Sequence, residues 1–250
     1  MAYINRRLYA HRGMSALVPE NTLSAFKKCA DYGVQWFEFD VDVIADGTVI
    51  VCHDSSLDRT TNKTGSYYGL TAKDLSDIDA GSWFSDEYRG EKLPTLSDVI
   101  NIMNEFDLNA NIEIKGCEAG KDYANKLIDS VIDQISNLNE GRQIIVSSFN
   151  HLLLAKFKEK APHITVACLW DANTVSADWY TTMQIVGAEY VHIEDKFVTQ
   201  DIVKLVKSKG FGINVWTVND LARANQLFNW GVDGIFTDVA HTFPKPYLDS

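Results

Sequence analysis

The chain has 250 residues, and its 34 acidic and 23 basic side chains give a formal net charge of −11. Nucleic acids and anionic membranes attract positively charged surfaces, so we expect neither as a partner. With 46% hydrophobic residues, 5 prolines and 15 glycines, the composition is that of a folded globular chain. Its length fits a single α/β domain, since barrels of roughly 250 residues are commonly one domain.

Short β-rich runs alternate with helical patterns along the chain. Strands are predicted to begin near Leu8, Trp36, Ala110, Gln143, Ile164, Glu189, Gly212 and Gly234. Between them, helices are predicted over 21–32, 96–106, 122–138, 152–160, 178–186, 199–209 and 220–230. This alternation predicts parallel strands joined by crossover helices. Eight such strands favour a closed (β/α)8 barrel over an open doubly wound sheet, because no glycine-rich phosphate loop follows an early strand.

The longest interval between strand starts runs from Trp36 to Ala110 and predicts an insertion. Residues 45–48, Ala-Asp-Gly-Thr, form a hairpin signal and are followed by the β-rich residues 49–53. A polar stretch with several glycines then extends over 54–93. We therefore expect one barrel domain over 1–250, with a hairpin and insertion subdomain at 44–94.

Location and redox state follow from what the chain lacks. Its first 13 residues have no apolar core or small-residue cleavage site of a secretory signal. No stretch approaches the roughly 20 mostly apolar residues that cross a bilayer, so we expect no membrane span. Its four cysteines show no CxxC pair, and we expect them to be reduced and buried (Cys29, Cys52, Cys117 and Cys168). These features predict a cytoplasmic protein.

Charged side chains alternate with apolar ones in two neighbouring predicted strands. Glu38, Asp40 and Asp42 share one face of the second strand, about 6.5 Å apart, and Glu113 and Lys115 share one face of the third. In a barrel covered by helices, these faces point inward, where charges are costly unless they are paired or bound to metal. Converging carboxylates without histidine or thiolate predict a Mg²⁺ or Ca²⁺ site. A buried salt-bridge network around Lys115 is the alternative.

Two histidines stand at strand ends. His11 opens the sequence His-Arg-Gly after the first strand, and His53 closes the predicted hairpin. Because imidazole titrates near neutral pH, the two can act as general acid and base on one reacting centre. The planar guanidinium of Arg12 and the point charge of Lys115 suit phosphate oxygens.

Three further positions have weaker signals. Asn21 or Thr22 is expected to cap the first helix. His192 lies in the sixth predicted strand, and its position favours a hydrogen-bonded core histidine over a residue that binds a ligand. Trp216, near the end of the seventh strand, fits core packing and a ligand-facing wall equally well.

Taken in order, several motifs resemble the glycerophosphodiester phosphodiesterase family of the bacterial cytoplasmic type. They are HRG, PENT, EFDVDVIADGTVIVCHDSSLDRTT, NIEIK, VWTVN and GVDGIFTD, from His11 to Asp238. The resemblance implies a (β/α)8 TIM barrel of the phospholipase C-like phosphodiesterase type, with a small insertion after the second strand. Two positions depart from the family pattern, Ala16 in the HRG loop and Gly116 after Lys115.

The resemblance also implies roles for individual residues. The catalytic acid and base correspond to His11 and His53, and the ligands of one divalent cation, Mg²⁺ or Ca²⁺, correspond to Glu38, Asp40 and Glu113. Substrate-binding positions correspond to Arg12 and Lys115 at the phosphate, Trp216 beside the glycerol and Glu20 in a supporting role.

The implied reaction is metal-dependent hydrolysis of small glycerophosphodiesters to glycerol 3-phosphate and an alcohol, such as choline or ethanolamine. One histidine deprotonates the glycerol 2-hydroxyl, which attacks phosphorus to give a cyclic phosphate, and the other protonates the departing alcohol. The motifs leave open which histidine acts first. A lysophospholipase D-like phosphodiesterase and a non-catalytic barrel that binds a phosphorylated ligand are the alternatives. The protein is expected to be a monomer or a homodimer.

Overall fold

Strands and helices alternate along the computed structural model, which describes residues 6–172, 174–244 and 247. The strands are β1 (Arg7–Ala10), β2 (Trp36–Val43), β3 (Val49–Val51), β4 (Asn109–Ile114), β5 (Ile144–Ser148), β6 (Thr165–Trp170), β7 (Tyr190–Glu194), β8 (Gly212–Trp216) and β9 (Gly234–Thr237). The α-helices are α1 (Leu23–Tyr32), α2 (Leu96–Glu105), α3 (Lys121–Ile135), α4 (His151–Lys160), α5 (Trp179–Val186), α6 (Gln200–Ser208) and α7 (Leu221–Trp230).

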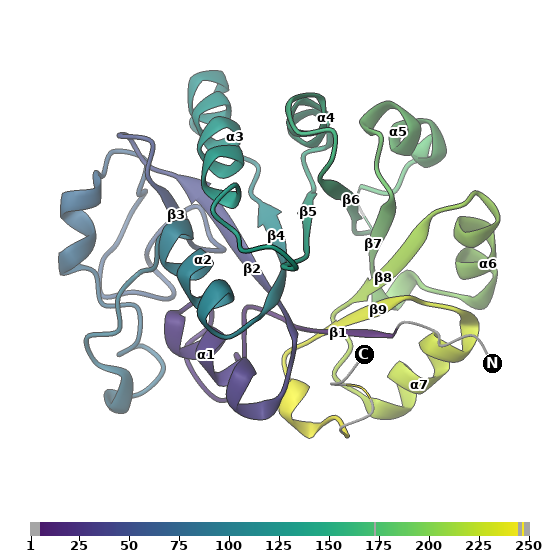
Figure 1. The fold of residues 1–250 in the computed structure, drawn as a ribbon, viewed down its shortest axis with the longest axis horizontal. Helices are drawn as coiled ribbons and strands as arrows, with labels where there is room; N and C mark the ends of the chain where they lie inside the picture. Colours follow the sequence, from purple (N-terminus) through teal and green to yellow (C-terminus); the bar gives the residue numbers. More distant parts are fainter. Residues whose placement is uncertain (1–5, 173, 245–246, 248–250) are drawn as a thin grey trace.

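The sheet closes on itself. Parallel pairing runs from β2 through β4, β5, β6, β7, β8 and β9 to β1, and β1 also pairs with β2. The helices lie around this ring of strands (Figure 1). The predicted (β/α)8 barrel is therefore confirmed, and each predicted strand begins within one residue of an observed one. None of the helices in the described ranges is long and apolar enough to cross a membrane.

Local chemistry sets the helix ends. The Thr22 side chain accepts a hydrogen bond from the backbone N–H of Ala25, so α1 begins at Leu23, two residues later than predicted. The helix ends at Gly33, whose φ of 73° is favourable for glycine. The predicted helix over 122–138 ends three residues early, at Ile135.

The inner face of the barrel changes character along the strands. Toward the strands' N-terminal ends, it is filled by an apolar cluster of Tyr9, Trp36, Ile145, Ala167 and Phe236. Toward their C-terminal ends, the inward positions become charged or polar. Opposite charges and a cavity replace apolar packing there, at the end where barrel enzymes place their active sites.

The segment between β2 and α2 forms the predicted insertion and extends to the left in Figure 1. It contains β3, which pairs antiparallel to β2, and the 3₁₀ helices η1 (Ala72–Asp77) and η2 (Asp86–Tyr88). It has its own buried cluster, including Ile50, Leu57, Tyr67 and Ile78. We propose the division into one barrel domain and a subdomain at 44–94 on this basis.

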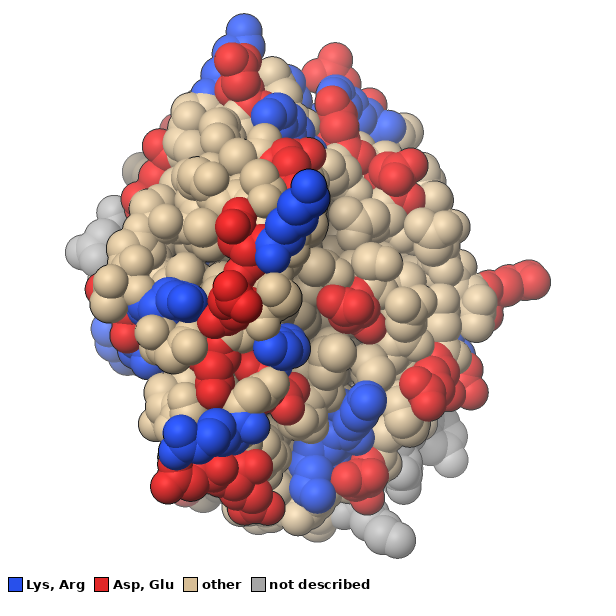
Figure 2. All heavy atoms as spheres, turned by 90° about the vertical axis from the view of Figure 1, so that its left-hand side faces the viewer, with Lys and Arg blue, Asp and Glu red and all other residues tan. Residues whose placement is uncertain are grey.

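Asp42 anchors the insertion to the barrel. Its Oδ2 accepts hydrogen bonds from the hydroxyls of Tyr67 at 2.8 Å and Tyr68 at 2.6 Å. This carboxylate therefore has a structural role, although it alternates in sequence with Glu38 and Asp40. On the side of the molecule that includes the insertion, acidic and basic side chains are interspersed (Figure 2).

Candidate active site

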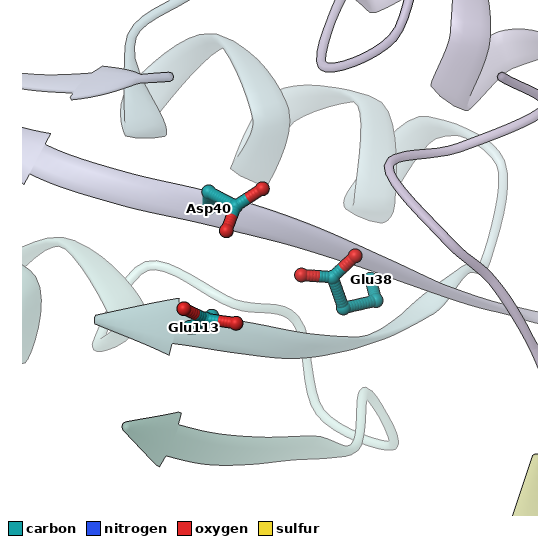
Figure 3. A group of neighbouring side chains, drawn as sticks. All are labelled: Glu38, Asp40 and Glu113. Atoms are coloured by element: carbon teal, nitrogen blue, oxygen red, sulfur yellow. The ribbon is translucent and has the colours of Figure 1, made fainter. Parts of the chain in front are cut away.

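Three carboxylates converge over neighbouring strands of the barrel. Glu38 and Asp40 extend from β2 and Glu113 from β4, where Asp40 and Glu113 are register partners (Figure 3). Each offers an oxygen within 4.8 Å of the others. Their side chains are 4%, 1% and 12% exposed, respectively. Such a concentration of buried negative charge requires compensation.

Two cations provide part of that compensation. The Lys115 ammonium donates to Glu113 at 2.7 Å and to Asp40 at 3.2 Å, and the Arg12 guanidinium lies 3.6 Å from Asp40. Although burial opposes ionisation of Asp40, Lys115 and Arg12 lower the pKa of this carboxyl. The salt-bridge network that we considered as an alternative is therefore present.

The network leaves one negative charge uncompensated, because it sets three carboxylates against two cations. The excess is visible at Glu38, where burial and the neighbouring Asp40 raise the carboxyl pKa to about 8. A divalent cation would remove it, and three buried carboxylates are the hard oxygen ligands that Mg²⁺ and Ca²⁺ prefer. The donor set therefore fits such a cation.

The loop after β1 positions His11 and Arg12. Arg12 has a φ of 58° and Gly13 one of 77°, and this turn directs the Arg12 backbone N–H at Glu38, 2.9 Å away. Gly13 must be glycine, because a Cβ there would lie 2.7 Å from the Cβ of Ala25 on α1. The Arg12 guanidinium donates to Glu20 at 2.8 Å.

Each of the two histidines is held by an aspartate. His11 Nδ1 lies 2.7 Å from Asp238 Oδ1, and His53 Nδ1 lies 2.7 Å from Asp54 Oδ1. A carboxylate only accepts hydrogen bonds, so Nδ1 donates and Nε2 is free to exchange a proton. Although burial alone lowers the pKa of His11, the hydrogen bond with Asp238 and the nearby Glu38 together raise it.

The predicted residues surround one cavity of about 150 Å³, which His11, Arg12, Glu38, His53, Glu113 and Trp216 line. The remaining three, Glu20, Asp40 and Lys115, contact this lining. Every predicted site residue therefore belongs to one connected group. Trp216 also packs edge-on against Phe149, with ring centroids 5.7 Å apart, and forms a wall of the cavity.

Comparison with known proteins decides the family. The profile of the glycerophosphoryl diester phosphodiesterase family matches residues 11–242. The chain belongs to this family. It is a phosphoric diester hydrolase with glycerophosphodiester phosphodiesterase activity.

Relatives cover nearly the whole chain. A glycerophosphodiester phosphodiesterase of Caldanaerobacter subterraneus subsp. tengcongensis is 34% identical, over 93% of this chain and 94% of the relative. Another from Bacillus subtilis is 31% identical, over 94% of this chain and 84% of the relative. An Oleispira antarctica phosphodiesterase, solved in complex with the product sn-glycerol-3-phosphate, has a TM-score of 0.90 and 29% identity, over 98% and 97% of the two chains.

Sequence reasoning missed several residues of this glycerophosphodiester phosphodiesterase site. Asn21, considered only as a helix cap, instead donates to Asp40 at 2.9 Å. Asp54 and Asp238, the partners of the histidines, were not singled out. Arg59 was also missed, although it donates to both Asp54 and Glu20. The available signal was motif membership, because Asn21 lies in PENT, Asp54 and Arg59 lie in EFDVDVIADGTVIVCHDSSLDRTT, and Asp238 ends GVDGIFTD.

Proposed function

We propose that the protein hydrolyses glycerophosphodiesters to glycerol 3-phosphate and an alcohol, using Mg²⁺ or Ca²⁺ held by Glu38, Asp40 and Glu113. The observation that carries this proposal is the pair of aspartate-held histidines beside a cavity with three buried carboxylates. The product complex of the Oleispira antarctica relative supports the choice of product.

Arg12 and Lys115 would hold the phosphate. Both are already fixed by carboxylates, Arg12 by Glu20 and Lys115 by Glu113, so their charges are preorganised before substrate binds. A bound divalent cation would supply Lewis-acid polarisation of the phosphoryl oxygens. Glu20 also accepts two hydrogen bonds from Arg59, and it would thereby support the orientation of Arg12.

We propose His11 as the first base and His53 as the first acid. His53 lines both the catalytic cavity and a second cavity of about 360 Å³, which also contains Asp54, Tyr68 and Lys115. The glycerol would occupy the first cavity and the departing alcohol the second. Nε2 of His11 would take the proton of the glycerol 2-hydroxyl as its oxygen attacks phosphorus.

The rest of the cycle keeps the protons balanced. The bond between phosphorus and the alcohol oxygen breaks, and Nε2 of His53 gives that oxygen a proton. A water molecule then loses a proton to His53 as it attacks the cyclic phosphate. His11 returns its proton to the glycerol 2-oxygen, which leaves both histidines in their starting states.

Chelation followed by separate additions of Mg²⁺ and Ca²⁺ tests the proposal, with glycerophosphocholine as substrate. We expect chelator to lower the release of glycerol 3-phosphate by more than about a hundredfold and one cation to restore it. The variant Glu113→Gln should not be restored, whereas Glu105→Gln, on the exposed side of α2, should behave like the parent. Full activity in chelator, or choline phosphate as the product, would contradict the proposal.

Lysophosphatidylcholine, assayed beside glycerophosphocholine, tests the lysophospholipase D-like alternative. We expect the smaller diester to be the better substrate. Cytoplasmic location, a monomer or homodimer, and the lack of a nucleic-acid partner stay predictions, and size-exclusion chromatography with light scattering tests the oligomeric state.

A further inference from the structure

The floor of the catalytic cavity is polar although it lies deep in the barrel. Asn111 on β4 and His192 on β7 both line the cavity, and they are 1% and 0% exposed. Asn111 stands two residues before Glu113 on the same strand, and His192 is the register partner of Asn214, two residues before Trp216. This floor therefore lies one inward-facing layer, about 6.5 Å, below Glu113 and Trp216.

His192 presents a hydrogen-bond donor that has no partner among the described residues. The Asn214 side-chain amide donates to His192 Nε2 at 2.9 Å, which places the proton of the neutral ring on Nδ1. Burial lowers the pKa of His192 to about 3, so the ring is uncharged at neutral pH. Phe236 packs edge-on against it, with ring centroids 5.0 Å apart. The donor at Nδ1 is thus buried, oriented and unused.

Asn111 presents the complementary acceptor. Its Nδ2 donates to Ser147 Oγ at 2.9 Å, which orients the amide and leaves Oδ1 without a partner in the described part of the chain. Buried polar atoms without partners are rare in folded proteins, because their lost hydration is not replaced. A donor and an acceptor that line the same cavity match an alcohol, since a hydroxyl both donates and accepts.

We propose that His192 Nδ1 and Asn111 Oδ1 bind the terminal hydroxyl of the substrate's glycerol moiety and thereby select glycerol over other alcohols at this end of the diester. The assignment rests on the proposed function, in which the glycerol occupies this cavity. Phe236, a member of the apolar cluster with Tyr9, lines the same cavity and packs against His192. A fatty-acyl ester at the terminal oxygen removes the donor proton, so such a substrate cannot donate a hydrogen bond to Asn111 Oδ1.

Two substrates that differ only in this hydroxyl test the proposal. Glycerophosphocholine has it, whereas the phosphocholine diester of propane-1,2-diol lacks it and keeps the attacking 2-hydroxyl. We expect the parent enzyme to favour glycerophosphocholine by about a hundredfold or more in kcat/KM, because a site built for a hydroxyl is left with unpaired polar groups by the analogue.

Variants assign this preference to His192. His192→Phe, which keeps an aromatic ring, should lower kcat/KM for glycerophosphocholine far more than for the propanediol diester and shrink the ratio to less than about tenfold. His192→Gln, which retains a donor, should keep an intermediate ratio. His163→Phe, at an exposed histidine, is the matched control and should leave the ratio unchanged. Thermal unfolding of each variant monitors the fold.

The outcomes separate this inference from the proposed function. A parent ratio near one, or a ratio that both His192 variants leave unchanged, overturns the inference while the hydrolysis itself stands. If the parent hydrolyses neither diester, the proposed function fails. In that case, calorimetry can compare the affinities for glycerol 3-phosphate and propane-1,2-diol phosphate. Tighter binding of glycerol 3-phosphate that His192→Phe abolishes would support the proposed role of His192 and Asn111. Equal affinities would overturn that role.

Discussion

His11 and His53 have the same hydrogen-bond geometry but different surroundings. Each Nδ1 lies 2.7 Å from an aspartate oxygen, yet the His11 side chain is 20% exposed and that of His53 is 35% exposed. On the barrel side, His11 and Asp238 follow β1 and β9, which are paired strands. On the insertion side, His53 and Asp54 follow β3 and rely on Arg59, which is itself 43% exposed.

The two histidines are therefore held by different physical means. Asp238 also accepts a hydrogen bond from Asn219 at 2.7 Å, so its position is set by β-barrel residues. Asp54 is held by an ion pair with Arg59, which is 43% exposed, and ion pairs with exposed partners contribute little stability. We expect substitutions of the groups that hold His11 on the barrel side to lower activity more than substitutions of the groups that hold His53 on the insertion side.

The largest effects should come from removing the histidines themselves. With glycerophosphocholine, His11→Asn and His53→Asn should each lower kcat by about 10²- to 10⁴-fold. A nitrophenol leaving group needs no protonation, so glycerophospho-p-nitrophenol should restore much of the rate in His53→Asn and little in His11→Asn. Release of nitrophenol, measured by absorbance, checks this. If the rate were restored in His11→Asn instead, His11 would be the first acid and His53 the first base.

Replacing each aspartate should show how much each histidine depends on its partner. Asp238→Asn should lower kcat/KM by about a hundredfold, because the less exposed of the two imidazoles loses its orienting partner. Asp54→Asn should cost about tenfold, since the His53 side chain is 35% exposed and water can replace part of the hydrogen bonding to its ring. In Asp238→Asn, the acidic limb of the pH–rate profile should move to lower pH, because Asp238 favours protonated His11 and its loss lowers the His11 pKa. Equal losses in the two variants would contradict the proposed asymmetry.

The three carboxylates Glu38, Asp40 and Glu113 should couple cation binding to pH. Without a cation, the Glu38 pKa is about 8, so this carboxyl is mostly protonated at neutral pH. Cation binding must release that proton, and the affinity for Mg²⁺ or Ca²⁺ should rise about tenfold per pH unit below pH 8 and level off above it. Calorimetric titrations between pH 6 and 9 measure this. Affinity independent of pH would exclude Glu38 as the coupled proton site.

The smallest effect should come from Arg59. Arg59→Gln removes hydrogen bonds to Glu20 and Asp54, but the Arg59 side chain is 43% exposed, so water can replace part of them. We expect a loss of less than about 1 kcal/mol in the free energy of unfolding and a few-fold loss in kcat/KM. Chemical denaturation and steady-state rates measure both. A loss in kcat/KM as large as that of Asp238→Asn would show that catalysis depends equally on the groups that hold His53 and those that hold His11.

The barrel, and the side chains that we propose as reacting groups, could be predicted from the sequence alone. Strand and helix periodicity is local, and it predicted the first residue of each barrel strand to within one position. Alternation along β2 and β4 placed Glu38, Asp40 and Glu113 on inward faces, because neighbouring side chains of a strand point in opposite directions. Together with His11 and His53, these residues were within reach of motif reasoning.

The hydrogen-bond partners of these groups follow from the tertiary structure and not from local sequence. Asp238 is 227 residues from His11 and reaches it only because β9 closes the barrel against β1. Asp42 shares the face of Asp40 in the strand pattern, yet the insertion folds over it and assigns it to Tyr67 and Tyr68. His192 and Asn111 come from strands far apart in sequence, and ring closure places both at one cavity floor. Periodicity reports the face of a strand, whereas contact depends on register and closure, which a single strand does not encode.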